Sequence, residues 1–295
     1  RSIRRPVKEG YPSDGTLSKE VQLLRQLFDY GQRNGYTLDP PEISLPKSKK
    51  RENRSRPGFT LEEFVHLEKI SKQRVLEFEQ SGKYNRFDPK NTEIGKNQRV
   101  YYDRVKLHAF CMIAGFTGMR PTELFNLSWG DLEYREITME NGLEHRVAVI
   151  QARGKGKDRE LAAMPETLTY FSSLRNAFFN VMNRFPNDDD PVFINNQGKR
   201  LRSFKHGMAD LLEAAGLRRA RDGRLRDSFS FRHFYITQQI REGVGHHILS
   251  RNTGTSTKMI DAYYSKVRPT EEIKQLIPDW LKRRPFKSHE KSRSG

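Results

Sequence analysis

Hydrophobic residues along the chain recur mostly at the spacing of helices. After Ser18, the apolar side chains at 21, 24, 27 and 28 fall on one helical face. Thr60-Leu61-Glu62-Glu63 is a capping box, in which the threonine hydroxyl and a glutamate carboxylate each satisfy a backbone N–H at a helix start. Helices are predicted over 18–35, from 60, over 102–116, from 121, and over 166–185, 203–215, 232–242, 245–251, 256–264 and 270–282.

One region departs from the helical period. Residues 134–140 and 144–152 predict strands joined at Asn141-Gly142, a dipeptide typical of hairpin turns. A Gly-Lys-Gly-Lys-Asp turn then leads to a third strand near 159–163. Residues 81–98 are polar and contain glycine, so we expect a loop there. The pattern predicts a mostly α protein with one small antiparallel sheet.

The segment 46–57 divides the chain. It is basic and has no large apolar side chain, so it cannot pack into a core but can lie along phosphates. We expect a short helical region over 1–45, the main domain over 58–284, and a disordered basic tail over 285–295. Because the chain opens on Arg1 rather than Met, we expect a fragment or a processed form.

Charge indicates the kind of partner. Lys and Arg total 54 against 37 Asp and Glu, which gives a net charge of +17 that is spread along the chain. That distribution favours a polyanion, and nucleic acid above all, over a basic protein that its charge merely keeps in solution.

Other classes of protein are disfavoured. The one cysteine, Cys111, lies in an apolar run and is typical of a core residue, so we expect neither a disulfide framework nor a zinc site. The Asp188-Asp189-Asp190 run is more typical of a solvated loop than of a metal site, and we predict no metal and no cofactor. No apolar run approaches the ~18 residues of a membrane span, and no signal peptide is visible, so a cytoplasmic location is the default.

Two arginines carry candidate chemistry. Arg120 follows Gly118 at a predicted helix start, where a guanidinium can hold two phosphate oxygens, and Glu123 one turn later could orient it. Arg232 lies among four aromatic residues, so we expect it to be partly buried against an acid or a ligand. Alone, Arg120 and Glu123 are equally typical of exposed helix charges.

A lysine and a tyrosine complete the set. Lys155, in a glycine-flanked turn, could give a proton to a leaving 5′ oxygen, and Lys157 is the competing choice. The phenol of Tyr264 could attack a phosphodiester, whereas Tyr263 points about 100° away on a helix, so only one of the two can enter a site. His233 could bond a carboxylate or the helix of the nucleophile, or be an ordinary core histidine.

In this order and spacing, these stretches resemble the tyrosine recombinase, or phage-type integrase, family over about residues 57–268 and more weakly over 16–45. In that family the tyrosine follows the last histidine or tryptophan position by nine residues, which here gives Thr255 and favours Tyr264 over Tyr263. Residues 117–124 resemble the family's first-arginine motif, and residues 153–159 resemble its lysine loop. Residues 231–237 resemble its second-arginine motif, and residues 249–265 resemble its terminal motif.

Two positions depart from the family pattern. Phe229 stands where the family has the histidine of His-x-x-Arg, and it cannot act as acid, base or hydrogen-bond donor. Thr255 replaces the later histidine or tryptophan, although its hydroxyl can still donate to a phosphate oxygen. Loss of a proton-transfer role would lower the rate by a factor on the order of 10². Charge stabilisation by the arginines would remain.

The resemblance implies an enzyme that cleaves and rejoins double-stranded DNA through a 3′-phosphotyrosine on Tyr264. Arg120, Arg232 and Thr255 would hold the phosphate, and Lys155 would protonate the leaving oxygen. Supporting positions of the site would be those of Glu123, His233 and Phe229. Further contacts to DNA are expected from the basic side chains of Lys47, Lys49, Lys50, Arg51, Arg54, Arg56 and Lys157.

The resemblance also implies a homotetramer on two DNA sites, serving integration or recombination of a mobile element in a bacterium or a phage. The predicted helix around 273–281 could dock on a neighbouring protomer or pack on its own domain. Residues 1–45 would be only the last part of the family's helical core-binding domain, so we expect weaker DNA binding than in a longer chain.

Two alternatives follow from the same residues. The departures at Phe229 and Thr255 suit a DNA-binding protein of this fold with an impaired site. A topoisomerase-like enzyme would relax DNA by the same chemistry without a partner site. An RNA-binding protein is a distant third, because no aromatic-rich sheet motif is present.

Overall fold

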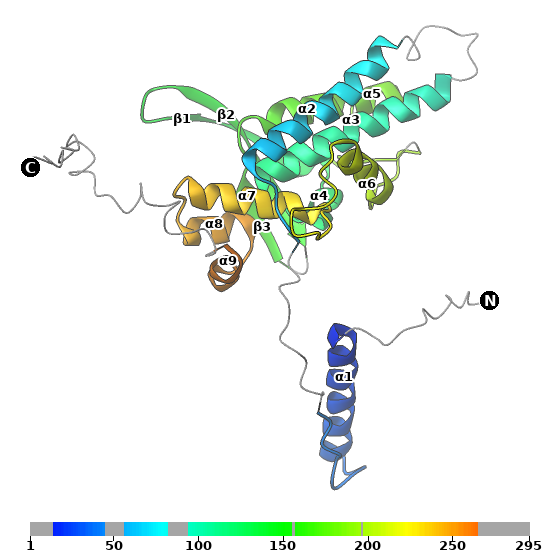
Figure 1. The fold of residues 1–295 in the computed structure, drawn as a ribbon, viewed down its shortest axis with the longest axis vertical. Coiled ribbons are helices and arrows are strands. Elements are labelled where there is room, and N and C mark those ends of the chain that lie inside the picture. The colour runs from blue at the N-terminus through cyan, green and yellow to red at the C-terminus, as the bar shows by residue number, and fades with distance from the viewer. Residues whose placement is uncertain (1–13, 45–55, 82–93, 155–156, 196, 265–295) are drawn as a thin grey trace, which may run out of the picture. The chain divides into compact units, whose positions relative to one another are not determined.

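The computed structural model describes residues 14–44, 56–81, 94–154, 157–195 and 197–264 (Figure 1). It divides into two compact units, Arg1–Arg54 and Ser55–Gly295, and their boundary falls within the basic segment 46–57. In the first unit the described helix is α1 (Asp14–Arg33). The guanidinium of Arg25 donates to the carbonyl oxygen of Ile43 at 2.6 and 3.0 Å, which ties the chain after α1 back to the helix.

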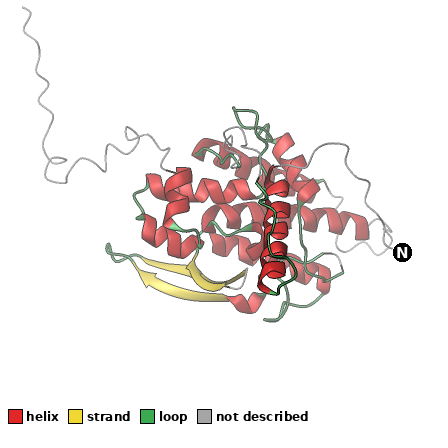
Figure 2. Cartoon of the chain, turned by 90° about the horizontal axis from the view of Figure 1, so that it is seen from below, coloured by secondary structure: helices red, strands yellow, loops and turns green. Residues whose placement is uncertain are grey.

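The second unit contains helices and one three-stranded sheet, as predicted. Figure 2 shows the strands along one side of the helices of this unit. The helices are α2 (Leu61–Gln80), α3 (Ile94–Thr117), α4 (Pro121–Asn126), α5 (Thr167–Met182), α6 (Lys205–Ala214), α7 (Phe229–Arg241), α8 (His246–Thr253) and α9 (Thr257–Tyr264). A 3₁₀ turn (Trp129–Asp131) precedes the strands β1 (Leu132–Thr138), β2 (Glu144–Gly154) and β3 (Lys157–Ala162).

Helix α3 is the centre of the core. Its side chains Phe110, Met112 and Ile113 are fully buried, and the helix packs against α2, α5 and α7 (Figure 1). Cys111 is fully buried as well, as predicted, and burial raises the pKa of its thiol. The expectation of a loop over 81–98 is wrong from residue 94 onward, because α3 starts there. Polar residues with good helix propensity, such as lysine and glutamine, extend a helix whose later turns are anchored in a core.

The sheet is antiparallel with the order β1-β2-β3. Glu133 pairs with Val149, and Val149 pairs with Ala162, so β2 is the central strand. The turn between β1 and β2 lies at the predicted Asn141-Gly142, where Gly142 takes a φ of +78° and the Asn141 side chain accepts from the Leu143 N–H at 3.1 Å. Strand β3 lies against α8, and β2 lies against α4.

A buried arginine fastens the start of α2 to the segment that leads into α7. The guanidinium of Arg226 is 5% exposed, donates to both carboxylate oxygens of Glu63 at 2.9 and 2.7 Å, and lies over the ring of Phe59. Its Nε donates to the carbonyl oxygen of Gly58 at 3.0 Å. Glu63 also completes the predicted capping box, because its carboxylate accepts from the Thr60 N–H at 2.9 Å. Two segments far apart in sequence therefore share one network of charged hydrogen bonds.

Substitution Arg226→Met should lower the free energy of unfolding by about 3–5 kcal/mol, because it leaves the Glu63 carboxylate without its partner. Urea unfolding followed by circular dichroism measures this change. The matched control is Arg224→Met, which removes a more exposed pair with Asp222 and should cost at most about 1 kcal/mol. Equal losses in the two variants would contradict a structural role for Arg226.

Candidate active site

Arg120 stands at the N-terminal end of α4, as predicted. Its backbone N–H donates to Oε2 of Glu123 at 2.8 Å, and its Nη1 donates to Oε1 of the same carboxylate at 2.7 Å. Its Nη2 donates to the carbonyl oxygen of Gly254 at 2.6 Å. The side chain keeps 35% of its surface exposed, so the guanidinium is held firmly and still meets solvent.

The partner that holds Glu123 from the other side is Arg159, on β3. Its Nη1 and Nη2 donate to the Glu123 carboxylate at 2.7 and 2.9 Å, and its Nε donates to the carbonyl oxygen of Asn252 at 3.2 Å. No site role was predicted for Arg159. The available signal was its position two residues before Leu161, because alternate residues of a strand share a face and Leu161 is buried.

Glu123 is buried and ionised. Burial alone would raise the pKa of this carboxyl group, but hydrogen bonds and charge from Arg159 and Arg120 outweigh it and lower the pKa to about 2. Only 2% of the side chain is exposed. Since an ionised carboxylate is stable in such a place only with cationic partners, Glu123 fixes both guanidinium groups.

Arg232 reaches the same region from α7. It is buried, its Nη1 donates to the carbonyl oxygen of Gly118 at 2.6 Å, and its Nη2 donates to Oγ1 of Thr255. The turn between α8 and α9 therefore receives one hydrogen bond from each predicted arginine, at Gly254 from Arg120 and at Thr255 from Arg232. The structure brings Arg120, Arg232, Glu123 and Thr255 together.

Two glycines make this close approach possible. Gly118 has a φ of +63°, and a Cβ there would lie 2.3 Å from the ring of Tyr235. Gly254 ends α8 with a φ of +64°, and a Cβ there would lie 3.1 Å from the guanidinium of Arg159. Both positions need left-handed backbone, which glycine adopts without strain.

Asn252 joins the turn to the sheet and to α7. Its Oδ1 accepts from the Ala162 N–H at 3.0 Å, and its Nδ2 donates to the Ala162 carbonyl at 3.3 Å, which continues the pairing of β3 with a side chain. The same Nδ2 donates to the hydroxyl of Tyr235 at 3.0 Å. One side chain near the end of α8 therefore links this helix to β3 and to α7.

Several predicted residues lie outside the described part of the structure. Tyr264 is the last residue of α9, and its side chain and that of Tyr263 are outside the described part. Lys157 is the first residue of β3, again without a described side chain. Lys155 and the linker residues Lys47, Lys49, Lys50, Arg51 and Arg54 lie outside the described residues entirely. Arg56 is described, is exposed, and pairs with Asp227 at 2.7 Å.

The two remaining predicted positions lie on α7. Burial, followed by the charge of Arg232, lowers the pKa of His233 to about 4, so this imidazole is neutral near pH 7. Its backbone packs against Gly58, at the start of the main unit. Phe229, the first residue of α7, keeps 42% of its surface exposed. His233 therefore follows Arg232 directly in the sequence. The position that resembles the family's histidine is occupied by Phe229, whose ring is exposed.

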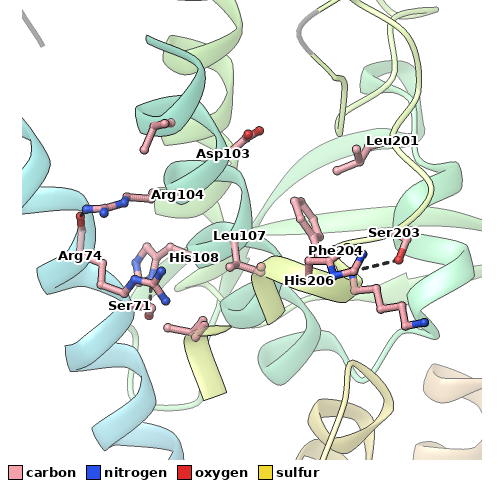
Figure 3. Close-up of a pocket in the computed structure, with 14 residues that line it drawn as sticks. Ser71, Arg74, Asp103, Arg104, Leu107, His108, Leu201, Ser203, Phe204 and His206 are labelled. Atoms are coloured by element: carbon pink, nitrogen blue, oxygen red, sulfur yellow. Dashed lines mark hydrogen bonds between the residues drawn. The ribbon is translucent and has the colours of Figure 1, made fainter. Parts of the chain in front are cut away.

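A pocket of about 390 Å³ opens beside the arginines and is lined by Arg120, Glu123, Arg159 and Gly254 among others. A second pocket, of about 620 Å³, lies between α2, α3 and α6 and is lined by none of the predicted site residues (Figure 3). There Ser71 and His108 share a hydrogen bond of 2.7 Å, and burial lowers the pKa of His108 to about 4.

Within the described ranges, no group of three or more His, Cys, Asp and Glu side chains could hold a metal ion. In the same part of the chain, no helix has the length and apolar character to cross a membrane.

The sequence profile of the phage integrase family matches residues 94–271. This range contains Arg120, Glu123, Arg159, Arg232 and Thr255. The chain belongs to the phage integrase family. This match covers more than half of the chain and includes the residues from α3 to the end of α9. A search of curated proteins finds no significant match for this phage integrase family member.

Solved structures share the fold of this family member. The XerH site-specific recombinase, in a post-cleavage complex with a palindromic difH substrate, matches with a TM-score of 0.58 and 19% identity over 86% of this chain. The match covers 64% of the XerH chain, so this chain spans less than two thirds of that protein. The Tn1549 transposon integrase, in complex with transposon right end DNA, matches with a TM-score of 0.58 and 15% identity, over 92% of this chain and 82% of its own.

The stability of the protein should fall as the pH drops from about 4.5 to about 2, because the folded pKa of Glu123 is depressed. The stabilisation is fully present above the ordinary carboxyl pKa and is lost as the folded protein takes up the proton. Its size is about 3 kcal/mol at neutral pH.

Substitution Glu123→Gln should remove this component. Urea unfolding at a series of pH values should show wild type more stable near pH 7 and the two proteins converging near pH 2. Parallel curves over that range would contradict an ionised Glu123 in the folded protein.

Proposed function

We propose that this chain is a tyrosine-type site-specific DNA recombinase that cleaves and rejoins double-stranded DNA through a 3′-phosphotyrosine on Tyr264. The observation that carries the proposal is the convergence of Arg120 and Arg232 on the turn at Gly254 and Thr255, and Thr255 lies nine residues before that tyrosine. Membership of the phage integrase family supports it. So do the XerH and Tn1549 proteins, whose structures contain DNA.

The arginines bind the non-bridging oxygens of the scissile phosphate. In the described contacts, Arg120 donates one side-chain hydrogen bond to the Glu123 carboxylate and another to a main-chain carbonyl. Arg232 donates to a main-chain carbonyl and to a hydroxyl. Carbonyl and hydroxyl oxygens neutralise a guanidinium far less than a carboxylate does. A phosphate can therefore take their place with a gain in charge-assisted hydrogen bonding, which strengthens as negative charge builds in the transition state.

The covalent step exchanges one phosphate ester for another. The phenol oxygen of Tyr264 attacks phosphorus, the bond to the 5′ oxygen breaks, and Lys155 gives that oxygen a proton. With Phe229 at the histidine position, the phenol proton passes to water. The 5′ hydroxyl of a partner strand then attacks the phosphotyrosine and releases Tyr264, so the link keeps its energy and no metal or nucleotide is consumed.

Assembly and DNA contact extend the proposal beyond the described residues. The basic linker, including Lys47, Lys49 and Arg51, follows the DNA backbone and confers a salt-dependent affinity. Four protomers act on two DNA sites, and the segment 273–281 docks on a neighbouring protomer.

A nicked suicide substrate tests the proposal. Because the target site is not specified by the residues, the substrate is a pool of nicked duplexes with randomised arms, from which covalent protein–DNA adducts are selected and sequenced. Wild type and Tyr263→Phe should form adducts, whereas Tyr264→Phe should form none, and mass spectrometry should place the DNA on Tyr264.

Loss of adduct with Tyr263→Phe alone would shift the nucleophile to Tyr263. DNA binding without any adduct would favour the second candidate, an impaired DNA-binding protein, which the exposed phenyl ring of Phe229 motivates. Relaxation of plasmids that lack the selected site would favour a topoisomerase-like enzyme.

A leaving-group substitution separates Lys155 from Lys157 as the acid. Lys155→Ala should slow cleavage of the selected site by about 10²–10⁴-fold, the usual contribution of general acid catalysis. A substrate with sulfur at the 5′ leaving position needs no such proton and should restore the rate. Lys157→Ala should change both substrates alike. If the 5′-sulfur substrate restores the cleavage rate of Lys157→Ala and not that of Lys155→Ala, then Lys157 is the general acid.

A further inference from the structure

A pocket of about 370 Å³ opens at the N-terminal end of α7 and shares no lining residue with the pocket beside Arg120. Its inner wall is aromatic and comes from α3, α4 and the start of α6, where Phe110, Phe125 and Phe204 pack on one another. Phe204 also lines the separate pocket drawn in Figure 3. The volume is within the range of about 300–1,000 Å³ that is common for ligand sites.

Phe229 lines this pocket and is 42% exposed. It is the first residue of α7, and Arg232 lies three residues later on the same helix. Side chains at i and i+3 are neighbours on one helical face, with Cβ atoms about 5–6 Å apart. Phe229, which lines the pocket, and Arg232, which binds the scissile phosphate in the proposed function, therefore start from neighbouring positions on α7.

The start of α7 is well anchored. Asp227 accepts from the backbone N–H of Phe229 at 2.9 Å, and its own N–H donates to Oγ of Ser230 at 3.1 Å. The other carboxylate oxygen of Asp227 pairs with Arg56 at 2.7 Å, so the last basic residue of the linker is held at the same place. Phe229 consequently presents its ring from a fixed backbone.

The other polar residues of the pocket are mainly cationic. Arg56, Lys205, Arg218 and Arg226 line it. The charge of Arg226 is balanced by Glu63, Arg56 pairs with Asp227, and Arg218 lies 4.0 Å from Glu213. Within the described residues, Lys205 is the cation of this pocket that is not in an ion pair. An aromatic wall beside Lys205 matches a ligand that has a flat apolar face and carries a phosphate.

We propose that this pocket receives one unstacked base of the cleaved DNA strand, next to the scissile phosphate, with the base stacked on Phe229. Lys205 contacts a phosphate next to that base, and Arg56 and Arg218 add positive charge to the same pocket. A phenyl ring has no hydrogen-bonding group with which to read a base edge in a groove, but its face stacks on any base. The inference rests on the proposed function, since it places the base relative to the phosphate at Arg232.

The experiment uses the full chain and the DNA site selected as adduct above. Binding is titrated at fixed salt with duplexes that lack a single base at successive positions around the cleavage point. One abasic position should weaken wild-type binding by about 10-fold, a typical value for one stacked base. Phe229→Ala should bind the intact site about 10-fold more weakly and lose nothing further at that abasic position. Phe229→Trp should keep the wild-type pattern.

Three controls exclude other causes. Phe185 lies after the end of α5, outside the pocket, and its ring is 52% exposed. Phe185→Ala should therefore leave the abasic pattern unchanged. A 2-aminopurine at the identified position should brighten when wild type binds, because it leaves the neighbouring bases that quench it in the duplex, and should stay dim with Phe229→Ala. Thermal unfolding of Phe229→Ala should match wild type, because the ring is partly exposed.

The possible results are distinct. Additive losses from Phe229→Ala and the abasic position would overturn the base pocket while leaving the recombinase proposal intact. So would Phe229→His binding and cleaving better than wild type without any abasic effect, since position 229 would then be only a missing imidazole. Failure of wild type to bind or cleave any DNA would instead overturn the proposed function, and the base pocket with it.

Discussion

The buried carboxylate of Glu123 is the interaction on which the rest of the site depends. It receives hydrogen bonds from Arg120 on one side and Arg159 on the other, and it lies in a place where an unpaired charge would be very costly. Because α4 carries Glu123, β3 carries Arg159 and the guanidinium groups continue to Asn252 and Gly254, one carboxylate links a helix, a strand and a turn.

This arrangement separates two kinds of arginine. Arg159 is committed to the protein, with its two terminal nitrogens on Glu123 and its Nε on a main-chain carbonyl. Arg120 shares the same carboxylate but remains about one third exposed beside the pocket. Arg159 therefore serves to hold the turn and the charge of Glu123, and Arg120 is the member of the pair that can meet a ligand.

Much of this could be predicted from the sequence, for reasons that are local. A hairpin dipeptide, a capping box and a proline in the first turn of a helix each depend on neighbouring residues, and each is found where it was predicted. The spacing of Glu123 from Arg120 predicted their contact, because residues three apart face each other on a helix. The start of α3 was missed because polar residues in a first turn resemble a loop.

The remainder of the site depends on distant contacts. Whether Glu123 is exposed or buried is decided by β3 and α8, whose packing no local pattern contains. The sequence marks Arg159 only by its alternation with the buried Leu161, and the two lysines of the same hairpin carry a stronger chemical signal. The bond from Asn252 to the end of β3 joins residues 90 positions apart and has no signature in either segment.

The departures at Phe229 and Thr255 affect different parts of the chemistry. Thr255 keeps a polar atom in contact with Arg232 at the turn that leads into α9, so the second arginine remains coupled to the helix that ends at Tyr264. Phe229 supplies no polar atom, and the neighbouring His233, whose pKa is about 4, adds no positive charge near pH 7. Among the described side chains of this site, positive charge comes from guanidinium groups, whose ionisation does not change across the physiological range. If the proposed function holds, phosphate binding should be less sensitive to pH than in a site that relies on imidazolium, and the pH dependence of cleavage near neutrality should come from the groups that transfer protons.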